Sequence, residues 1–137
     1  MALKPELADA YLNAHFVVLG EPEFTLRIGR PSPRLDALLE AEGAASAAFI
    51  TAANPRSKRR SDAENHAAFL SFSASMSKAP YACHPGVGRD PFGNWPEKSL
   101  LIVGIPRAEA EALGRSLGQN AIVFVEKGKP PELAVLV

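Results

Sequence analysis

Polar residues gather around one turn in the middle of the chain, in the run Thr51-Ala52-Ala53-Asn54-Pro55. Thr51 and Asn54 end an apolar segment that we predict to be a strand, and ligands bind at the carboxyl ends of strands in open α/β sheets. Asn65 falls in the first turn of the next predicted helix, whose free backbone N–H groups point toward the same place. We therefore predict that Thr51, Asn54 and Asn65 bind a small polar or anionic molecule. Local structure is the alternative, because Asn-Pro makes turns.

A capping box opens that helix. In Ser61-Asp62-Ala63-Glu64 the hydroxyl of Ser61 and the carboxylate of Glu64 can each satisfy a free backbone N–H group. We interpret Ser61 and Glu64 as structural caps, which leaves neutral amides and hydroxyls to orient a ligand.

Two further segments carry candidate ligand-binding residues. Gln119, in Gly118-Gln119-Asn120-Ala121, can turn its amide toward a ligand, although a helix stop explains the segment equally well. Between residues 81 and 97, a pocket could be lined by Tyr81, Arg89, Trp95 and Glu97. We predict ligand contacts for Gln119, Tyr81 and Trp95; the alternative for the aromatic residues is that they pin the loop to the core.

The sequence contains none of the common catalytic motifs. The chain has no Gly-x-Ser-x-Gly elbow, no His-Glu-x-x-His motif and no phosphate loop. Cys83 and His84 are adjacent, so in a strand they point to opposite faces. The three histidines lack metal-ligand spacing. We assign no catalytic residue, expect neither a metal nor a cofactor, and leave open whether the protein is an enzyme.

Two other segments suggest macromolecular partners. The basic run Arg56-Ser57-Lys58-Arg59-Arg60 suggests a nucleic-acid accessory protein, but 15 basic residues balance 15 acidic ones, so nucleic acid is not expected. The segment 61–77 has two apolar lines, Ala63-Ala67-Leu70-Ala74 and Phe69-Phe72-Met76. So wide an apolar face suggests cover from a partner, and a homodimer or regulatory module is the alternative function.

The periodicity predicts a mixed α/β chain with one sheet. Helices are predicted over 5–14, 33–42, 61–77 and 106–117, and strands over 15–19, 24–28, 47–52, 81–84, 99–104, 121–125 and 133–137. From residue 47 the order is β-α-β-β-α-β, the ferredoxin-like order, preceded by a helix, a hairpin and a helix. We expect 47–52 to be a central strand, and 99–104 and 121–125 to lie in the same sheet and pair in parallel. Residues 85–96 are predicted to form an ordered loop.

Length and composition place the chain among small globular proteins. Its 137 residues fit a single domain spanning 1–137, and 47% of them are hydrophobic. The single cysteine, Cys83, fits a reducing compartment. No apolar stretch is long enough for a membrane helix and no leader is evident, so we expect a cytoplasmic protein without membrane partners.

Four segments together resemble a known family. These are Phe49–Pro55, the Glu64-Asn65 pair, Trp95–Ser99 and Gly118–Ala121. In order and spacing they resemble the bacterial domain-of-unknown-function family 3293, over about Tyr11 to Val125. Ala53 departs from the family pattern, in which an aromatic residue is common. The resemblance marks Thr51, Asn54, Glu64, Asn65 and Gln119 as characteristic residues and implies no assigned activity.

Overall fold

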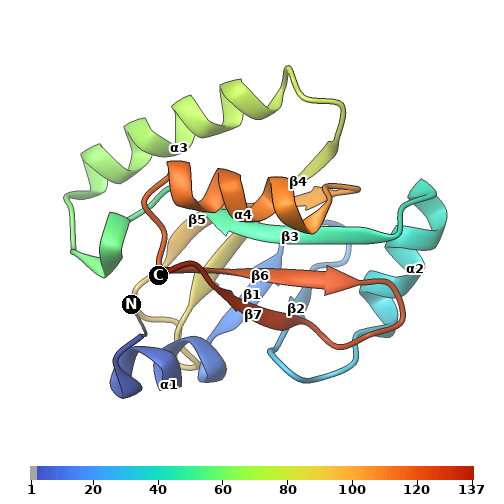
Figure 1. Cartoon of the computed structure of the whole chain (residues 1–137), viewed down its shortest axis with the longest axis horizontal. Helices are drawn as coiled ribbons and strands as arrows, with labels where there is room; N and C mark the ends of the chain where they lie inside the picture. The colour runs from blue at the N-terminus through green and yellow to red at the C-terminus, as the bar shows by residue number, and fades with distance from the viewer. Residues whose placement is uncertain (1–2) are drawn as a thin grey trace.

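The computed structural model describes residues 3–137 as a seven-stranded antiparallel sheet with helices on both faces (Figure 1). The elements follow the chain as α1 (Pro5–Asn13), β1 (His15–Val18), β2 (Phe24–Leu26), α2 (Pro33–Glu42), β3 (Ser46–Thr51), a 3-10 turn (Pro55–Ser57), α3 (Asp62–Met76), β4 (Ala82–Arg89), β5 (Glu97–Val103), α4 (Arg107–Ser116), β6 (Ala121–Glu126) and β7 (Glu132–Val135). The strands lie in the order β2-β1-β4-β5-β3-β6-β7. The mixed α and β class expected from the sequence is confirmed.

β3 is a central strand, as its nearly continuous apolar sequence predicts. It pairs with β5 on one side and β6 on the other. Ala48 and Ile50 join a core with α3 and α4, while Ala47 and Phe49 join a second core with α2. Alternate residues of a strand point to opposite faces, so a strand covered on both faces must be apolar throughout.

One pairing prediction is wrong. β5 and β6 lie in one sheet, as predicted, but β3 is inserted between them and every adjacent pair of strands is antiparallel. The crossover through α4 therefore passes over β3 instead of joining neighbours. The periodicity of β5 and β6 gives no information about which strand separates them.

The predicted loop over 85–96 is also partly wrong, because β4 continues to Arg89 and pairs with both β1 and β5. Gly86 belongs to this strand. A Cβ at Gly86 would lie 2.6 Å from the Phe49 ring and 2.8 Å from the carbonyl oxygen of Val17. The glycine here allows a neighbouring ring and backbone to approach closely. In the sequence, such a glycine looks the same as one that marks a turn.

The predicted capping box of α3 is confirmed, and α2 has a side-chain cap as well. Ser32 caps α2, and at α3 the hydroxyl of Ser61 accepts from the Glu64 N–H while the Glu64 carboxylate accepts from the Ser61 N–H. On α3, Phe72 and Met76 are buried and Phe69 packs against the same core. Of the two apolar lines of this helix, Phe69-Phe72-Met76 is thus covered by the chain's own sheet, whereas Ala63-Ala67-Leu70-Ala74 is exposed. Among residues 3–137, no helix has the length and apolar character needed to cross a membrane.

Candidate functional site

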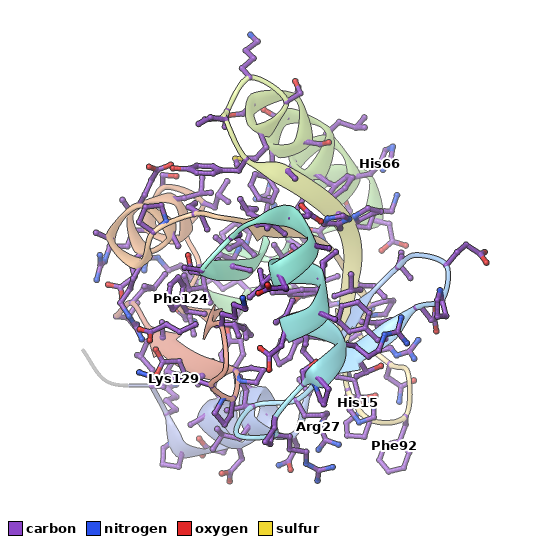
Figure 2. The ribbon with its side chains drawn as sticks, turned by 90° about the vertical axis from the view of Figure 1, so that its right-hand side faces the viewer. His15, Arg27, His66, Phe92, Phe124 and Lys129 are labelled. Carbon is purple, nitrogen blue, oxygen red and sulfur yellow. The ribbon has the colours of Figure 1, made fainter. Side chains whose placement is uncertain are left out.

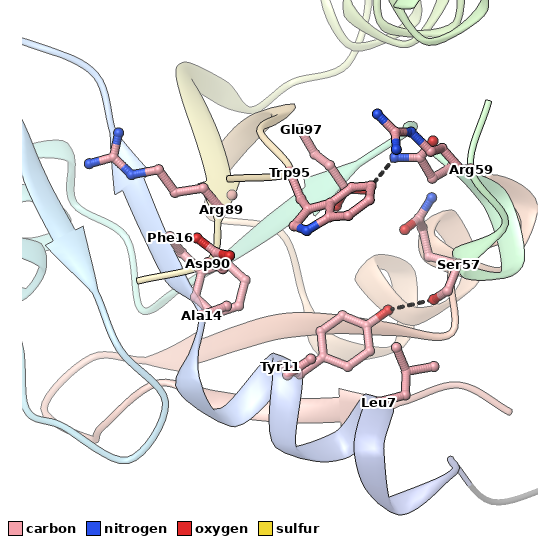
Figure 3. Close-up of a pocket in the computed structure, with 14 residues that line it drawn as sticks. Leu7, Tyr11, Ala14, Phe16, Ser57, Arg59, Arg89, Asp90, Trp95 and Glu97 are labelled. Carbon is pink, nitrogen blue, oxygen red and sulfur yellow. Dashed lines mark hydrogen bonds between the residues drawn. The ribbon is translucent and has the colours of Figure 1, made fainter. Parts of the chain in front are cut away.

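A cavity of about 330 Å³ lies between α1, the turn after β3 and the hairpin that joins β4 to β5 (Figure 3). Its wall combines aromatic, polar and charged side chains. It is lined by Leu7, Ala10, Tyr11, Ala14, Phe16, Asn54, Ser57, Arg59, Gly88, Arg89, Asp90, Trp95, Glu97 and Gln119. The volume falls at the lower end of the range of about 300–1,000 Å³ for small-molecule sites.

Glu97 brings a largely buried carboxylate to this cavity. It is the first residue of β5, and its Oε2 accepts a hydrogen bond of 2.7 Å from the Asn54 side-chain amide. Burial raises the pKa of Glu97 because it disfavours the charged form, and the hydrogen bond from Asn54 partly opposes this. In the described part of the chain, Oε1 has no hydrogen-bond partner and is not enclosed. One carboxylate oxygen is therefore available to a molecule in the cavity.

A pair of asparagines fixes the Asn54 amide. Asn65 accepts from the Asn54 backbone N–H and donates to Asn54 Oδ1, both at 2.9 Å. The Arg60 backbone N–H also donates to Asn54 Oδ1, at 2.9 Å. Asn54 can then present its amide nitrogen only to Glu97. Asn65 does not line the cavity, and its contribution is to position Asn54.

Several residues at the cavity have a left-handed backbone conformation. Within residues 3–137, four non-glycine residues have positive φ, at Asn54 (46°), Arg56 (59°), Ser57 (58°) and Trp95 (58°). Three of them line the cavity, and Arg56 lies between the other two turn residues. This conformation is unfavourable for residues with a Cβ and is found most often where function requires a particular geometry.

Aromatic rings form two sides of the cavity, as Figure 3 shows. The Arg59 guanidinium stacks 4.4 Å from the centre of the Trp95 ring. Across from it, the Tyr11 hydroxyl lies 3.4 Å from Ser57 Oγ, which also accepts from the Asn120 amide at 3.0 Å. Burial raises the pKa of Tyr11, so its hydroxyl stays protonated at neutral pH.

The other predicted ligand-binding residues take different positions. Gln119 lines the cavity, but its amide donates to the Ala53 carbonyl at 3.0 Å. Thr51 is outside the lining and donates to the Lys98 carbonyl at 2.7 Å. Tyr81 is also outside it, with its hydroxyl donating to Glu109 at 2.8 Å. The structure therefore brings together Asn54, Gln119 and Trp95 at the cavity and leaves Thr51, Asn65 and Tyr81 outside its lining.

Sequence reasoning missed Tyr11 and Ser57 as lining residues and considered Arg59 only as part of a basic run. A signal for Tyr11 existed in the sequence, because Leu7 and Tyr11 recur at helical spacing and so mark the face of α1 that turns toward the rest of the chain. For Ser57 no pattern in the sequence announces the left-handed turn. Across residues 3–137, no three His, Cys, Asp or Glu side chains are grouped so that they could hold a metal ion.

A family model described as a protein of unknown function (DUF3293) matches residues 50–122, more than half of the chain. The matched segment contains nine lining residues of the cavity, from Asn54 to Gln119, whereas the other five, from Leu7 to Phe16, precede it. No curated protein and no solved structure matches the chain significantly.

Proposed function

We propose that this chain, which belongs to the DUF3293 family of proteins of unknown function, binds a small polar molecule in the cavity beside Glu97. The observation that carries the proposal is the Glu97 carboxylate. It is largely buried, it is held by Asn54 at 2.7 Å, and its second oxygen is left without a protein partner among the described residues. Buried carboxylates are costly unless they are hydrogen-bonded, so a ligand that donates to Oε1 would relieve this cost.

The charge of the site indicates the chemistry of the ligand. A carboxylate accepts hydrogen bonds and a protonated carboxyl donates one, so an N–H or O–H group of the ligand suits the ionised form of Glu97. Tyr11, Phe16 and Trp95 offer ring surface for a flat or partly apolar body. Arg59 is exposed at the rim, where its charge would favour an anionic substituent.

The test is a thermal-shift screen of polar metabolites against the wild-type protein and the Glu97→Gln variant. A ligand at 100 times its Kd stabilises a protein by about 2.7 kcal/mol, which corresponds to a Tm increase of about 10 °C for a chain of this size. The amide of Glu97→Gln keeps an acceptor for Asn54 but presents an N–H group to the ligand. We expect it to abolish the shift.

Glu109→Gln is the matched control, because it makes the same chemical change at an exposed carboxylate that lies outside the cavity. It should leave the ligand-induced shift intact. The proposal is wrong if no compound shifts the wild-type Tm, or if Glu97→Gln responds as strongly as the wild type.

The alternative functions have less support. In α3 the Phe69-Phe72-Met76 line packs on the sheet of the same chain, so a dimer through this helix would have only the exposed line Ala63-Ala67-Leu70-Ala74, in which Leu70 is the single large side chain. Nucleic-acid binding through the 56–60 turn would rest on Arg56 and Lys58, because Arg59 stacks on Trp95 and Arg60 lies 4.0 Å from Glu64. Two exposed basic side chains in a chain with balanced charge give weak support to this function.

We extend the proposal to the type of fold and to the location of the protein in the cell. We propose that β3, α3, β4, β5, α4 and β6 form a ferredoxin-like unit to which the other elements were added; the strand order β4-β5-β3-β6 supports it. We also propose a cytoplasmic location, which the free thiol of Cys83 supports.

A further inference from the structure

Three neighbouring strands bring basic side chains together at the end of the sheet away from α4. His15, the first residue of β1, is in register with Arg89, the last residue of β4. On its other side, Phe16 pairs with Leu26 of β2, so the antiparallel register places Arg27 beside His15. Directly opposed residues of antiparallel strands share a face of the sheet. Arg27, His15 and Arg89 therefore form a row on one face, which we call the basic row.

A fourth basic residue joins the row from the turn after β2. The Arg30 backbone N–H donates to the Arg27 carbonyl at 3.2 Å, which closes a tight turn and brings Arg30 next to the row. Figure 2 shows His15 and Arg27 in the same region of the surface. Burial, Arg27, Arg89 and Arg30, in decreasing order, lower the pKa of His15, while Asp90 opposes them. Asp90 is the acidic group that faces His15.

The protein leaves these charges unneutralised. Across residues 3–137, the side chains of Arg27, Arg30 and Arg89 form no ion pair and no hydrogen bond, and Arg27 Nε is enclosed without a partner. The carboxylate of Asp90 is engaged by its own loop, because Oδ1 accepts from the backbone N–H groups of Phe92 and Asn94 at 2.9 and 2.8 Å. Three arginines without acidic partners, one at the end of β4 and two directly after β2, repel one another unless an anion shares their charge.

The ligand that this chemistry fits is a compact dianion. Arginine presents a planar fork of N–H donors that matches the oxygens of a phosphate group, and a protonated histidine adds a further donor. Strands lie about 4.8 Å apart, so guanidinium groups on β2 and β4 can reach one anion placed over β1. Arg89 also lines the edge of the cavity described above, but Figure 3 shows its side chain directed away from Trp95 and Tyr11.

We propose that the basic row, together with Arg30, is a second binding site that takes the phosphate group of a phosphate monoester or of free phosphate. The site shares Arg89 with the cavity wall, but it takes a different ligand and its test does not need the cavity ligand. A phosphodiester, which carries a single negative charge and two blocked oxygens, should bind more weakly. Inorganic phosphate, glycerol phosphate and dimethyl phosphate are therefore the probes that distinguish free phosphate, a monoester and a nucleic-acid-like diester.

The experiment follows the His15 imidazole by NMR while each probe is titrated at constant ionic strength. A bound dianion favours protonated His15, so saturation with phosphate or glycerol phosphate should raise the pKa of His15. Arg27→Gln and Arg30→Gln should each weaken binding by about tenfold or more. Arg30 is exposed, so its variant remains informative if Arg27→Gln, which alters a partly buried side chain, fails to fold.

Arg115→Gln is the matched control, because it removes one positive charge from α4 on a remote part of the chain. It should bind phosphate as the wild type does. Three results would overturn the proposal: a His15 signal that does not saturate, equal losses in Arg30→Gln and Arg115→Gln, or dimethyl phosphate binding as tightly as glycerol phosphate. The last would assign the row to nucleic-acid phosphates instead.

Discussion

Replacing Asn65 with alanine tests how the turn after β3 is held. The substitution removes two hydrogen bonds of 2.9 Å, one from the Asn54 backbone N–H and one to Asn54 Oδ1. Asn54 Oδ1 keeps the bond from the Arg60 N–H, but the Asn54 backbone N–H loses its partner in a part-buried position. Asn54 has a left-handed conformation, so the turn has little intrinsic preference for its native shape.

The expected loss in the free energy of unfolding can be worked from these contacts. A hydrogen bond contributes about 0.5–1.5 kcal/mol net, and a buried donor left without a partner costs about 1–3 kcal/mol. Alanine recovers about 0.5 kcal/mol of helix propensity at this position in α3. Because the turn can partly open to water, we expect a net loss of about 2 kcal/mol, or a decrease in Tm of about 6–8 °C.

Urea unfolding followed by circular dichroism measures this loss. Asn13→Ala is the control, because it removes a single exposed side-chain bond, to the Asp9 carbonyl, and should cost less than about 0.5 kcal/mol. A loss below about 0.5 kcal/mol for Asn65→Ala would refute the reasoning. Such a result would mean that the fold does not need the Asn65 amide. It would favour the prediction from the sequence, in which Asn65 binds a ligand.

Three further predictions concern the core, a helix cap and the buried carboxylate. Phe49→Ala should lower the free energy of unfolding by about 3–5 kcal/mol, because this ring is 4% exposed and packs edge-on at 5.5 Å against Phe16; a loss below 1 kcal/mol in urea unfolding would contradict its burial. Ser61→Ala should cost about 0.5–2 kcal/mol by removing the cap of α3, and Ser61→Asp, which restores an acceptor, should recover most of it in the same assay. For Glu97 the folded pKa lies above the ordinary value of 4.5, so its contribution to stability is greatest below that pH and is lost as the pH rises through the folded pKa. The Tm of Glu97→Gln should therefore rise relative to that of the wild type as the pH increases from about 4.5, and a Tm difference that does not change with pH would show that the carboxylate is well solvated.

Most of the elements could be predicted because their signals are local. The Ser61 and Glu64 caps and the continuous apolar run of β3 depend on residues close together in the chain. The insertion of β3 between β5 and β6 depends on contacts far apart in sequence. For β4, Pro85 and two glycines resemble a loop, and only the position of the Phe49 ring shows why a residue without a side chain is required at Gly86.

For the candidate site, the sequence predicted the location more accurately than the role of each residue. Asn54 and Trp95 were expected at a ligand site, and both line the cavity. Asn65 was given the same role, but the structure uses its amide to hold Asn54. A polar residue near a helix start looks the same in sequence whether it faces a ligand or a neighbouring turn. The separation of Tyr81 has a similar cause, since it precedes β4 while Trp95 follows it, and the length of that strand was underestimated.

Helix α1 has a consequence for how the cavity exchanges with solvent. No residue of α1 is buried, yet Leu7 and Tyr11 form part of the cavity wall. A helix held by so little apolar burial should undock at a small free-energy cost, while the sheet behind it stays folded. Its backbone amides should therefore exchange with deuterium far faster than those of β3. The cavity would then open by movement of α1. A bound ligand would be detected because the amides of residues 5–13 would exchange with deuterium more slowly.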